Sequence, residues 1–432
     1  MAGADVQTLL QRMVALWQML WADYPAFQNE ERPLRVEWVT RTFPAIQELA
    51  GEIDRQGLPA AGRYPRPVEL AALDWVLSHR ARRMGARQTV HSVTTDGQRF
   101  MIHLRSLPRP FSRHDTQSGN LAFWLRYHRI LPASIRGYTI HIHPLDGKYA
   151  RMLSEKELRL FLGTFPDHCA PDWRKECKPY YVATTLRCFD PPTADALAVR
   201  AHSIRTALQE AQEVGAQVVL FPELAVCAEH RRTIVDWLRA HKKPPFVLVI
   251  PGSFHEDFGR PLQKPYTERR NRTSILNGAG QTILDQDKLI PIAVDNVLTA
   301  GASQQQQDGV VFEGVGSANA LHLLDTPIGL MAVAICRDLL QESSPITDLW
   351  EYVAPDWLLV PSMSPGISGH RAAAERLWRM YGTKVLVANQ CLQGDFKKTE
   401  HGFVSPLEPI RLAKMRVLSY DADAVSSQEN RP

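Results

Sequence analysis

The sequence predicts a layered α/β fold for residues 178–416, in which strands alternate with amphipathic helices. Residues 194–214 repeat apolar side chains at helical spacing, and residues 217–221 form the short apolar run expected of a buried strand. Residues 329–335 and 384–389 are further apolar runs of strand length. This alternation favours helices packed on sheets over an all-helical or all-strand domain.

Residues 1–177 are expected to form a separate α+β domain, which we assign to no family. Apolar periodicity predicts helices within residues 5–84. Asp96 and Gly97 lie between two strand-like segments and predict a β-hairpin with a tight turn. Residues 154–162 begin with a serine followed three residues later by a glutamate, a pattern that predicts the start of a helix.

The composition is typical of a folded protein without a membrane span. The chain has 432 residues, of which 44% are hydrophobic and 22% are charged, and it contains no run of 18 or more apolar residues. Its first twenty residues have neither a basic start nor a small-residue cleavage site, so we expect neither a signal peptide nor a membrane anchor. Residues 417–432 lose the apolar pattern and are expected to form a loose tail.

The cysteines and histidines predict no metal site. Six cysteines are spread along the chain without a CxxC pair, as expected for the reduced thiols of a cytoplasmic protein. His168, Cys169 and Cys177 could be grouped as zinc ligands, but their spacing does not match the common structural sites. His141 and His143 share one face of a predicted strand, and a structural role is more common for such a pair. We therefore expect no metal and no cofactor.

Positive charge is concentrated in residues 78–151, which hold thirteen Lys and Arg residues against three Asp residues. An imbalance of this size sets a local electrostatic field. One interpretation is a solvated, arginine-rich face. The other is a surface that binds nucleic acid or another polyanion, with interleaved aromatic side chains such as Phe111 and Trp124 stacking on bases. The segment contains no recognised nucleic-acid motif, and aromatic residues at this spacing more often belong to a core.

Three residues at predicted strand ends are candidates for catalysis. Cys336 follows an apolar run, at the kind of turn where a nucleophile stands clear of a sheet. Glu223 ends another such run, and Lys288 follows a third predicted strand. Taken singly, each has a simpler interpretation, as a buried thiol, a solvated carboxylate or a surface ammonium.

The segments around these residues resemble the nitrilase superfamily of carbon–nitrogen hydrolases. Five blocks match the family in order and spacing across residues 178–416. The blocks are residues 218–224, the series Asn271, Gly280 and Lys288, the series Gly329, Cys336, Arg337 and Asp338, residues 356–362, and residues 385–390. Each block alone is a weak signal, whereas five blocks in register identify the family.

The resemblance implies an α-β-β-α sandwich and hydrolysis of a non-peptide amide bond. In that chemistry Cys336 attacks the amide carbon and forms a thioester, Glu223 acts as the general base, and Lys288 stabilises the oxyanion. The residues expected to support them are Asn271, Arg337 and Asp338. The resemblance also implies a homodimer in which two sandwiches stack, and a small-molecule amide as substrate.

One position departs from the family pattern. The family usually has a second glutamate a few residues after the lysine, which orients it, but no glutamate follows Lys288 closely. Asp295 could serve, although its side chain is one methylene shorter. Glu342 matches a different acid of the family and is slightly out of register. The departure leaves open a nitrilase-like binding or regulatory module with weak or lost catalysis, such as a component of a defence or regulatory system.

The residues after the cysteine favour the amidase-like branch. True nitrilases usually carry Trp-Glu there, whereas this chain has Arg337 and Asp338. Leu339 and Leu340 stand where carbamoylases usually have an arginine, which disfavours a carbamoyl amino acid as substrate. The absence of predicted membrane helices disfavours an apolipoprotein acyltransferase.

Overall fold

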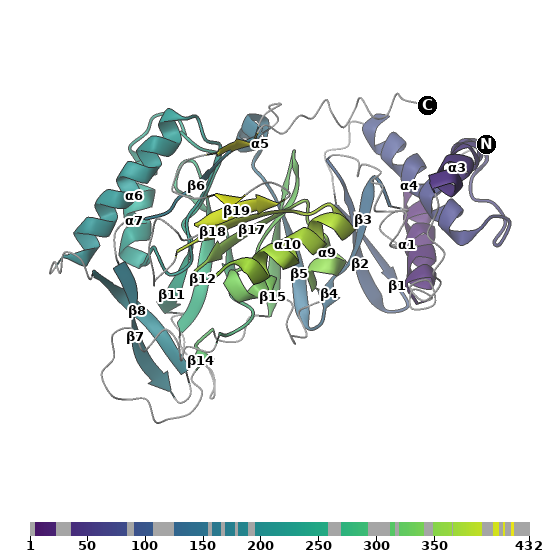
Figure 1. Ribbon diagram of the computed structural model, residues 1–432. Coiled ribbons are helices and arrows are strands. Elements are labelled where there is room, and N and C mark those ends of the chain that lie inside the picture. Colours follow the sequence, from purple (N-terminus) through teal and green to yellow (C-terminus); the bar gives the residue numbers. More distant parts are fainter. Residues whose placement is uncertain are drawn as a thin grey trace. The chain divides into compact units, whose positions relative to one another are not determined.

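The structure is a computed structural model, shown in Figure 1, in which two compact units can be distinguished. The described residues are 5–22, 36–83, 90–106, 125–153, 158–165, 169–177, 180–188, 195–257, 269–292, 312–315, 319–340, 349–364, 366–390, 401–405, 409–410 and 416–418. Unit 1 comprises residues 1–135 with two short returns at 351–354 and 379–382, and unit 2 comprises the rest. Within the described ranges, no helix is long and apolar enough to cross a membrane.

Unit 1 combines helices with a small antiparallel sheet. The elements are α1 (Val6–Ala22), α3 (Val36–Gln56), α4 (Arg66–Arg83), β1 (Val90–Thr95), β2 (Gln98–Leu104), β3 (His128–Pro132) and β4 (Ser134–Ile135). Leu9, Leu73 and Phe100, from α1, α4 and β2, share one hydrophobic core. The predicted hairpin is confirmed, because β1 pairs with β2 and both Asp96 and Gly97 have positive φ angles at the turn.

The boundary between the units lies near residue 135, not near residue 177 as the sequence suggested. β5 (Tyr138–Pro144) pairs in parallel with β15 (Ala320–Thr326), and β6 (Leu158–Leu162) pairs in parallel with β9 (Val218–Leu220). Both early strands therefore complete sheets of unit 2. The helix expected over residues 154–162 is wrong in its described part, because alternate leucines of β6 face the core of unit 2.

The first sheet of unit 2 carries a parallel centre. Its strand order is β11-β12-β10-β9-β6-β21, with β13 beside β12. The strands not yet introduced are β10 (Leu248–Ile250), β11 (Ser253–Asp257), β12 (Arg269–Asn277), β13 (Thr282–Asp287) and β21 (Arg416–Leu418). Because β21 pairs with β6, the loose tail expected from residue 417 begins in fact with a paired strand. The remainder of that tail lies outside the described residues.

The second sheet of unit 2 runs in the order β20-β19-β18-β17-β16-β15-β5. Its further strands are β16 (Gly329–Val333), β17 (Trp357–Ser362), β18 (Lys384–Asn389), β19 (Gly402–Ser405) and β20 (Pro409–Ile410). β16, β17 and β18 are parallel to one another. Their carboxyl ends consequently meet at one edge of the sheet, which is where α/β folds position reactive groups.

The two sheets face each other, and helices lie on their other faces (Figure 1). Leu220 and Leu248 of the first sheet share a core with Met331 and Leu359 of the second. The helices of unit 2 are α5 (Gly147–Leu153), α6 (Ala196–Glu213), α7 (Ala228–Arg239) and α10 (Ser368–Tyr381), while α9 (Leu349–Val353) belongs in part to unit 1. Helix α5 differs from the others because its Tyr149 and Leu153 pack into the core between the two sheets. Helices α6 and α7 cover the opposite face of the first sheet, and α10 contacts the second sheet where its Arg371 lies over Phe403. The α/β prediction is therefore confirmed.

A small third sheet pairs residues 312–313 with a strand that lies far away from them in the sequence. β14 (Phe312–Glu313) pairs in parallel with β8 (Tyr180–Cys188), which pairs with β7 (Cys169–Cys177). The Glu313 N–H donates to the Ile292 carbonyl, and the Gly314 N–H donates to the Tyr181 carbonyl. These bonds fix the register of β14, so the Glu313 side chain is completely buried.

Candidate active site

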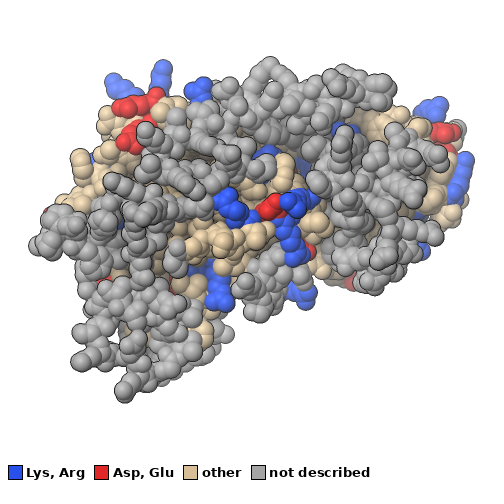
Figure 2. Space-filling model, viewed as in Figure 1, with Lys and Arg blue, Asp and Glu red and all other residues tan. Residues whose placement is uncertain are grey.

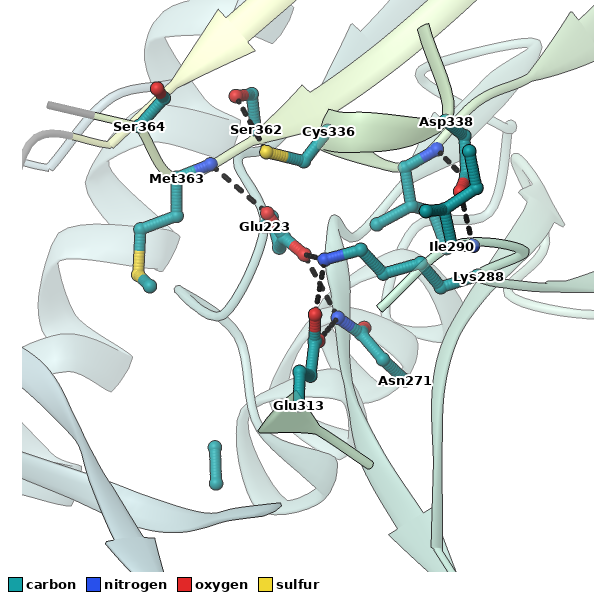
Figure 3. A network of polar contacts seen from close by, with 12 residues as sticks. Glu223, Asn271, Lys288, Ile290, Glu313, Cys336, Asp338, Ser362, Met363 and Ser364 are labelled. Carbon is teal, nitrogen blue, oxygen red and sulfur yellow. Dashed lines mark hydrogen bonds and ion pairs between the residues drawn. The ribbon is translucent and has the colours of Figure 1, made fainter. Parts of the chain in front are cut away.

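Three strand ends of unit 2 bring Glu223, Lys288 and Cys336 together, as the sequence predicted (Figure 3). Glu223 follows β9, Lys288 directly follows β13, and Cys336 begins a 3-10 turn (Cys336–Leu339) after β16. None of the three is more than 4% exposed. Lys288 Nζ donates to Glu223 Oε1 at 2.7 Å. Cys336 lies close enough to Glu223 for each group to shift the pKa of the other.

A second buried carboxylate, Glu313, contacts the lysine, and sequence reasoning missed it. Lys288 Nζ lies 2.5 Å from Glu313 Oε2. Asp295 and Glu342, which the sequence offered as substitutes for the missing family glutamate, lie outside the described residues. The only sequence signal for Glu313 was the short apolar stretch that ends there, which is typical of a strand. Because Glu313 is distant from Lys288 along the chain, the sequence did not indicate their contact.

Asn271, which the sequence offered as a supporting residue, joins the two carboxylates. It lies in β12, and its side-chain Nδ2 donates to Glu223 Oε1 at 2.9 Å and to Glu313 Oε1 at 2.6 Å (Figure 3). The Asn271 side chain is completely buried. Two carboxylates therefore share one ammonium and one amide as donors, an arrangement that fixes the position of the ammonium.

The charges of this network act on one another strongly because water is excluded. Burial alone would lower the pKa of Lys288, but Glu223 and Glu313 together outweigh it and raise the pKa above its usual value. Burial alone would raise the pKa of Glu313, but the ammonium of Lys288 outweighs burial and lowers that pKa. Burial raises the pKa of Glu223, and the charge of Glu313 adds to the effect of burial. Glu223 is thus the carboxylate better able to take up a proton.

His255 lies behind Glu313, on β11. The Ala183 N–H donates to His255 Nδ1 at 3.2 Å, so the ring hydrogen of the neutral imidazole is on Nε2. That nitrogen is 3.5 Å from Glu313 Oε1. Burial lowers the pKa of His255 to about 4, which keeps the ring neutral at physiological pH. The imidazole is therefore placed to support the ionised form of Glu313.

Cys336 occupies a strained turn that presents its sulfur to Glu223. Its φ angle of 48° lies in the left-handed region, which is unusual for a residue other than glycine. Burial and then the charge of Glu223 raise the pKa of the Cys336 thiol to about 12, against the opposing effect of Lys288. The thiol therefore keeps its proton until a base removes it, which fits Glu223 as that base.

Asp338 ties the cysteine turn to the lysine strand. Its carboxylate accepts the backbone N–H groups of Leu289, Ile290 and Ile335, at 3.0, 2.8 and 3.1 Å (Figure 3). Burial raises the pKa of Asp338 to about 7, although these N–H groups and Lys288 oppose the rise. Arg337, also predicted to support the site, is half-buried, and no described contact joins its guanidinium to the catalytic candidates.

No group of three His, Cys, Asp or Glu residues within the described ranges is arranged to hold a metal. His141 and His143 do share a strand face, and His322 of β15 joins them. The His143 Nε2 and His322 Nδ1 atoms are 2.9 Å apart, and the rings of His141 and His322 stack at 5.0 Å. The other candidate ligands, His168 and the side chains of Cys169 and Cys177, lie outside the described residues.

The basic segment 78–151 uses several of its arginines inside unit 1. Arg80 pairs with Asp54 at 2.8 Å, while Arg105 and Arg129 donate to backbone carbonyls. On the face shown in Figure 2, described basic side chains lie in small groups, several of them beside acidic ones. Phe111 and Trp124 lie outside the described residues. The described part therefore supports internal roles for these three arginines.

No protein-family model matches the chain, and no curated protein matches it. The solved structures that resemble it include an amidase from Nesterenkonia sp., at 16% identity and a TM-score of 0.31 over 44% of this chain and 70% of that chain. A mutant of the Nesterenkonia AN1 amidase from the nitrilase superfamily has 15% identity and a TM-score of 0.34 over 53% and 88%. The C. elegans NitFhit protein has 17% identity and a TM-score of 0.40 over 54% and 60%. Because these values are low, the chemistry of the chain has to be inferred from its own side chains.

Proposed function

We propose that unit 2 is an amidase-like carbon–nitrogen hydrolase of the nitrilase type, which cleaves a non-peptide amide bond through a thioester on Cys336. The observation that carries the proposal is the Lys288 ammonium held between two buried carboxylates, Glu223 and Glu313, beside the Cys336 thiol. Burying three charged groups is costly, and a fold retains such a group where its chemistry is used.

In the first half of the reaction, Glu223 takes the thiol proton and the Cys336 sulfur attacks the amide carbon. The carbonyl π electrons move to oxygen, and the ammonium of Lys288 stabilises the resulting oxyanion. The tetrahedral intermediate then collapses. Its C–N bond breaks as Glu223 returns the proton to the leaving nitrogen, so an amine or ammonia departs and a thioester remains.

In the second half, water replaces the amine. Glu223 takes a proton from the water as its oxygen attacks the thioester carbon, and Lys288 again stabilises the oxyanion. The C–S bond breaks, the sulfur recovers the proton held by Glu223, and a carboxylic acid leaves. Glu313 keeps Lys288 charged and in place throughout, which makes it the second acid that the family pattern requires.

The helix–sheet–sheet–helix order of unit 2 and the residues after Cys336 support the amidase-like branch. We propose further that the protein is a homodimer, as the family resemblance implies, and that it is cytoplasmic, as its six scattered cysteines suggest. Light scattering of the purified full chain tests the oligomeric state. A molar mass equal to that of one chain at all protein concentrations would rule out the homodimer without affecting the proposed chemistry.

The experiment that tests the chemistry is incubation of the full chain with a panel of small amides, followed by mass spectrometry of the protein and assay of released ammonia or amine. We expect an acyl adduct on Cys336 and turnover of at least one amide. C336A and K288A should abolish turnover, and E223Q should block it while the thermal unfolding midpoint stays near that of the wild type. C227A, which removes another buried thiol of unit 2, is the matched control and should retain turnover. An adduct on Cys227 with Cys336 unmodified would refute the proposal.

A further inference from the structure

The two oxygens of the Glu223 carboxyl have different hydrogen-bond partners. Oε1 accepts from the Lys288 ammonium and from the Asn271 amide, at 2.7 and 2.9 Å. Oε2 accepts from a backbone group, the N–H of Met363, at 3.1 Å. Figure 3 shows this N–H reaching Glu223 from the side opposite Lys288. Since Oε1 already has two donors, Oε2 is the oxygen better placed to take up a proton.

Met363 lies just beyond the end of β17, where the backbone pairing of β17 with β18 stops. The last residue pair of the two strands is Ser362 with Asn389. The Met363 side chain is buried and packs with Leu224 and Phe254 in one apolar cluster. A side chain anchored in this way does not by itself fix the direction of the backbone N–H, so the backbone on either side of Met363 has to be held as well.

The side chain of Asn389 continues the contact between β17 and β18 past their last backbone pair. Its Oδ1 accepts the Ser364 N–H at 2.9 Å, and its Nδ2 donates to the Ser364 carbonyl at 3.0 Å. One buried amide thus satisfies both backbone groups of Ser364, as a neighbouring strand would. On the other side of Met363, the Gln390 N–H donates to the Ser362 carbonyl at 3.0 Å. The residues before and after Met363 are therefore both held by the end of β18.

We propose that Asn389 is a positioning residue, which holds the Met363 N–H against Glu223 and so keeps this carboxylate ionised and ready to accept the thiol proton. The inference rests on the proposed function, in which Glu223 is the base. An N–H donor favours an ionised carboxylate over the neutral acid, so it opposes the burial that raises the pKa of Glu223.

The Met363 N–H acts on the nucleophile in the same direction, because it opposes the rise in the pKa of the Cys336 thiol. It therefore favours negative charge on either member of the Glu223–Cys336 pair. Two groups that interact this closely lose their protons as a pair. A weaker Met363 bond should raise the pH at which the pair gives up its first proton.

The experiment measures the rate at which iodoacetamide alkylates Cys336 in the full chain, between about pH 5 and pH 10, with the modified peptide quantified by mass spectrometry. This readout needs no amide substrate. The rate should fall on the acid side as the pair becomes fully protonated, and we call this fall the acid limb. In E223Q the acid limb should move to alkaline pH, because the thiol then has to ionise without a base.

In N389A we expect the acid limb to move up by about one pH unit, because a hydrogen bond to a charged group is weakened. The alkylation rate at a pH below the limb should fall about tenfold, while the rate above the limb should change much less. General damage to the site would lower the rate at every pH and would leave the position of the limb unchanged.

N277A is the matched control. Asn277 ends β12 and is also a buried asparagine whose side chain holds a turn, since its Oδ1 accepts the N–H groups of Ala279 and Gln281 at 3.0 and 3.1 Å. These bonds do not involve Met363 or Glu223, so the acid limb of N277A should equal that of the wild type.

A second variant, N389S, keeps the test decisive if N389A does not fold. Its hydroxyl is too short to bond to both backbone groups of Ser364, so it should move the acid limb in the same direction as N389A. Circular dichroism of every variant at both ends of the pH range checks that the measured protein is folded.

The outcomes separate this inference from the proposed function. A wild-type Cys336 that iodoacetamide never modifies, or an acid limb that E223Q leaves in place, overturns the proposed function and this inference with it. An acid limb that depends on Glu223 but is the same in wild type and in the folded Asn389 variants overturns the inference alone and leaves Asn389 as a structural residue of β18.

Discussion

Glu313 shows how one residue can complete a site that the nearby sequence leaves incomplete. Cys336, Glu223 and Lys288 were predictable as candidate residues because each sits in a short block with fixed spacing to its neighbours. Glu313 was not, because residues 289–311 separate Lys288 from the strand that holds Glu313, and that strand is only two residues long. Its contact with Lys288 arises from the pairing of β14 with β8, which is a tertiary feature.

We predict that E313Q lowers kcat by about 10- to 100-fold with little change in KM. The amide preserves the shape of Glu313 but removes the charge that stabilises the Lys288 ammonium, and one hydrogen bond to a charged group contributes about 1.5–3 kcal/mol. Steady-state kinetics with the amide found in the panel provides the measurement.

The control for this prediction is E256Q. Glu256 is another largely buried carboxylate of unit 2, and it pairs with Arg231 instead of Lys288. If E256Q and E313Q reduce kcat equally, the loss reflects general damage to unit 2 and Glu313 has no special relation to the lysine.

At the scale of elements, most strands predicted within residues 178–416 were confirmed. The secondary structure predicted within residues 1–177 was wrong where the local sequence pattern and the tertiary packing favour different structures. Ser154 and Glu157 match a helix start, but residues 158–162 form β6 because their leucines fill the core between two sheets. The local sequence does not indicate that β5 and β6 belong to unit 2, since Thr139 of β5 pairs with Ala320 and Leu160 of β6 pairs with Val218, both far along the chain. For the same reason, the boundary between the two units lies near residue 135 and not near residue 177, where the sequence predicted it.

The approach of two backbones at Gly252 gives an element-scale prediction. Gly252 connects β10 to β11 with a φ angle of 80°, and a Cβ placed there would lie 1.9 Å from the Pro222 carbonyl oxygen. Pro222 directly precedes Glu223, so G252A should displace the Glu223 carboxyl, reduce turnover strongly and destabilise unit 2 by about 2 kcal/mol. Urea unfolding and kinetics measure the two effects.

The matched control is G137A. Gly137 has a φ angle of 86°, but nothing lies within 4 Å of a Cβ added there. This variant shares the backbone strain and lacks the collision, so it should be only mildly destabilised and fully active. Equal losses of activity in both variants would contradict a specific displacement of Glu223.

At the scale of the whole molecule, we expect the neutral histidines to make the folded protein less stable at acid pH. His255, His322 and His370 each have a pKa lowered to about 4, mainly by burial. An unfolded chain binds these protons near pH 6.5, so the folded protein resists protonation. The stability contributed by the neutral rings is fully present above about pH 6.5 and is lost as the pH falls toward 4.

We expect H322Q to shift the midpoint of acid unfolding to lower pH, because His322 would no longer have to remain neutral beside His141 and His143. Circular dichroism during an acid titration measures the midpoint. H202Q is the control, since His202 lies on α6, away from this cluster. An unchanged midpoint in H322Q would show that other groups control the acid transition.

The excess of basic residues in 78–151 gives a second whole-molecule prediction, that the full chain binds single-stranded nucleic acid weakly and with strong dependence on salt. Arg82 and Arg99 are exposed members of this segment. The double variant R82Q/R99Q should reduce the slope of log affinity against log salt by about 1.4, since each neutralised phosphate of a single strand contributes about 0.7. Fluorescence anisotropy at several salt concentrations measures the slope.

K242Q/K243Q is the matched control, because it removes the same charge from an exposed position outside the segment. It should leave the slope unchanged. Absence of binding at low salt, or binding that salt does not alter, would leave the arginines of unit 1 with internal and solvated roles only.

The two-residue length of β14 has a consequence for how this chain can vary. Side chains of a strand alternate between faces, so a slip of one residue against β8 would turn Glu313 away from Lys288 and offer Phe312 or Gly314 to the ammonium instead. The hydrogen bonds of Glu313 and Gly314 to Ile292 and Tyr181 prevent that slip from both sides. Insertions or deletions within residues 293–311 can therefore change the length of the connection without moving the carboxylate. Related sequences can therefore differ widely in the number of residues between Lys288 and Glu313 and still form the same site. A sequence alignment that penalises gaps would fail to match Glu313 between such sequences.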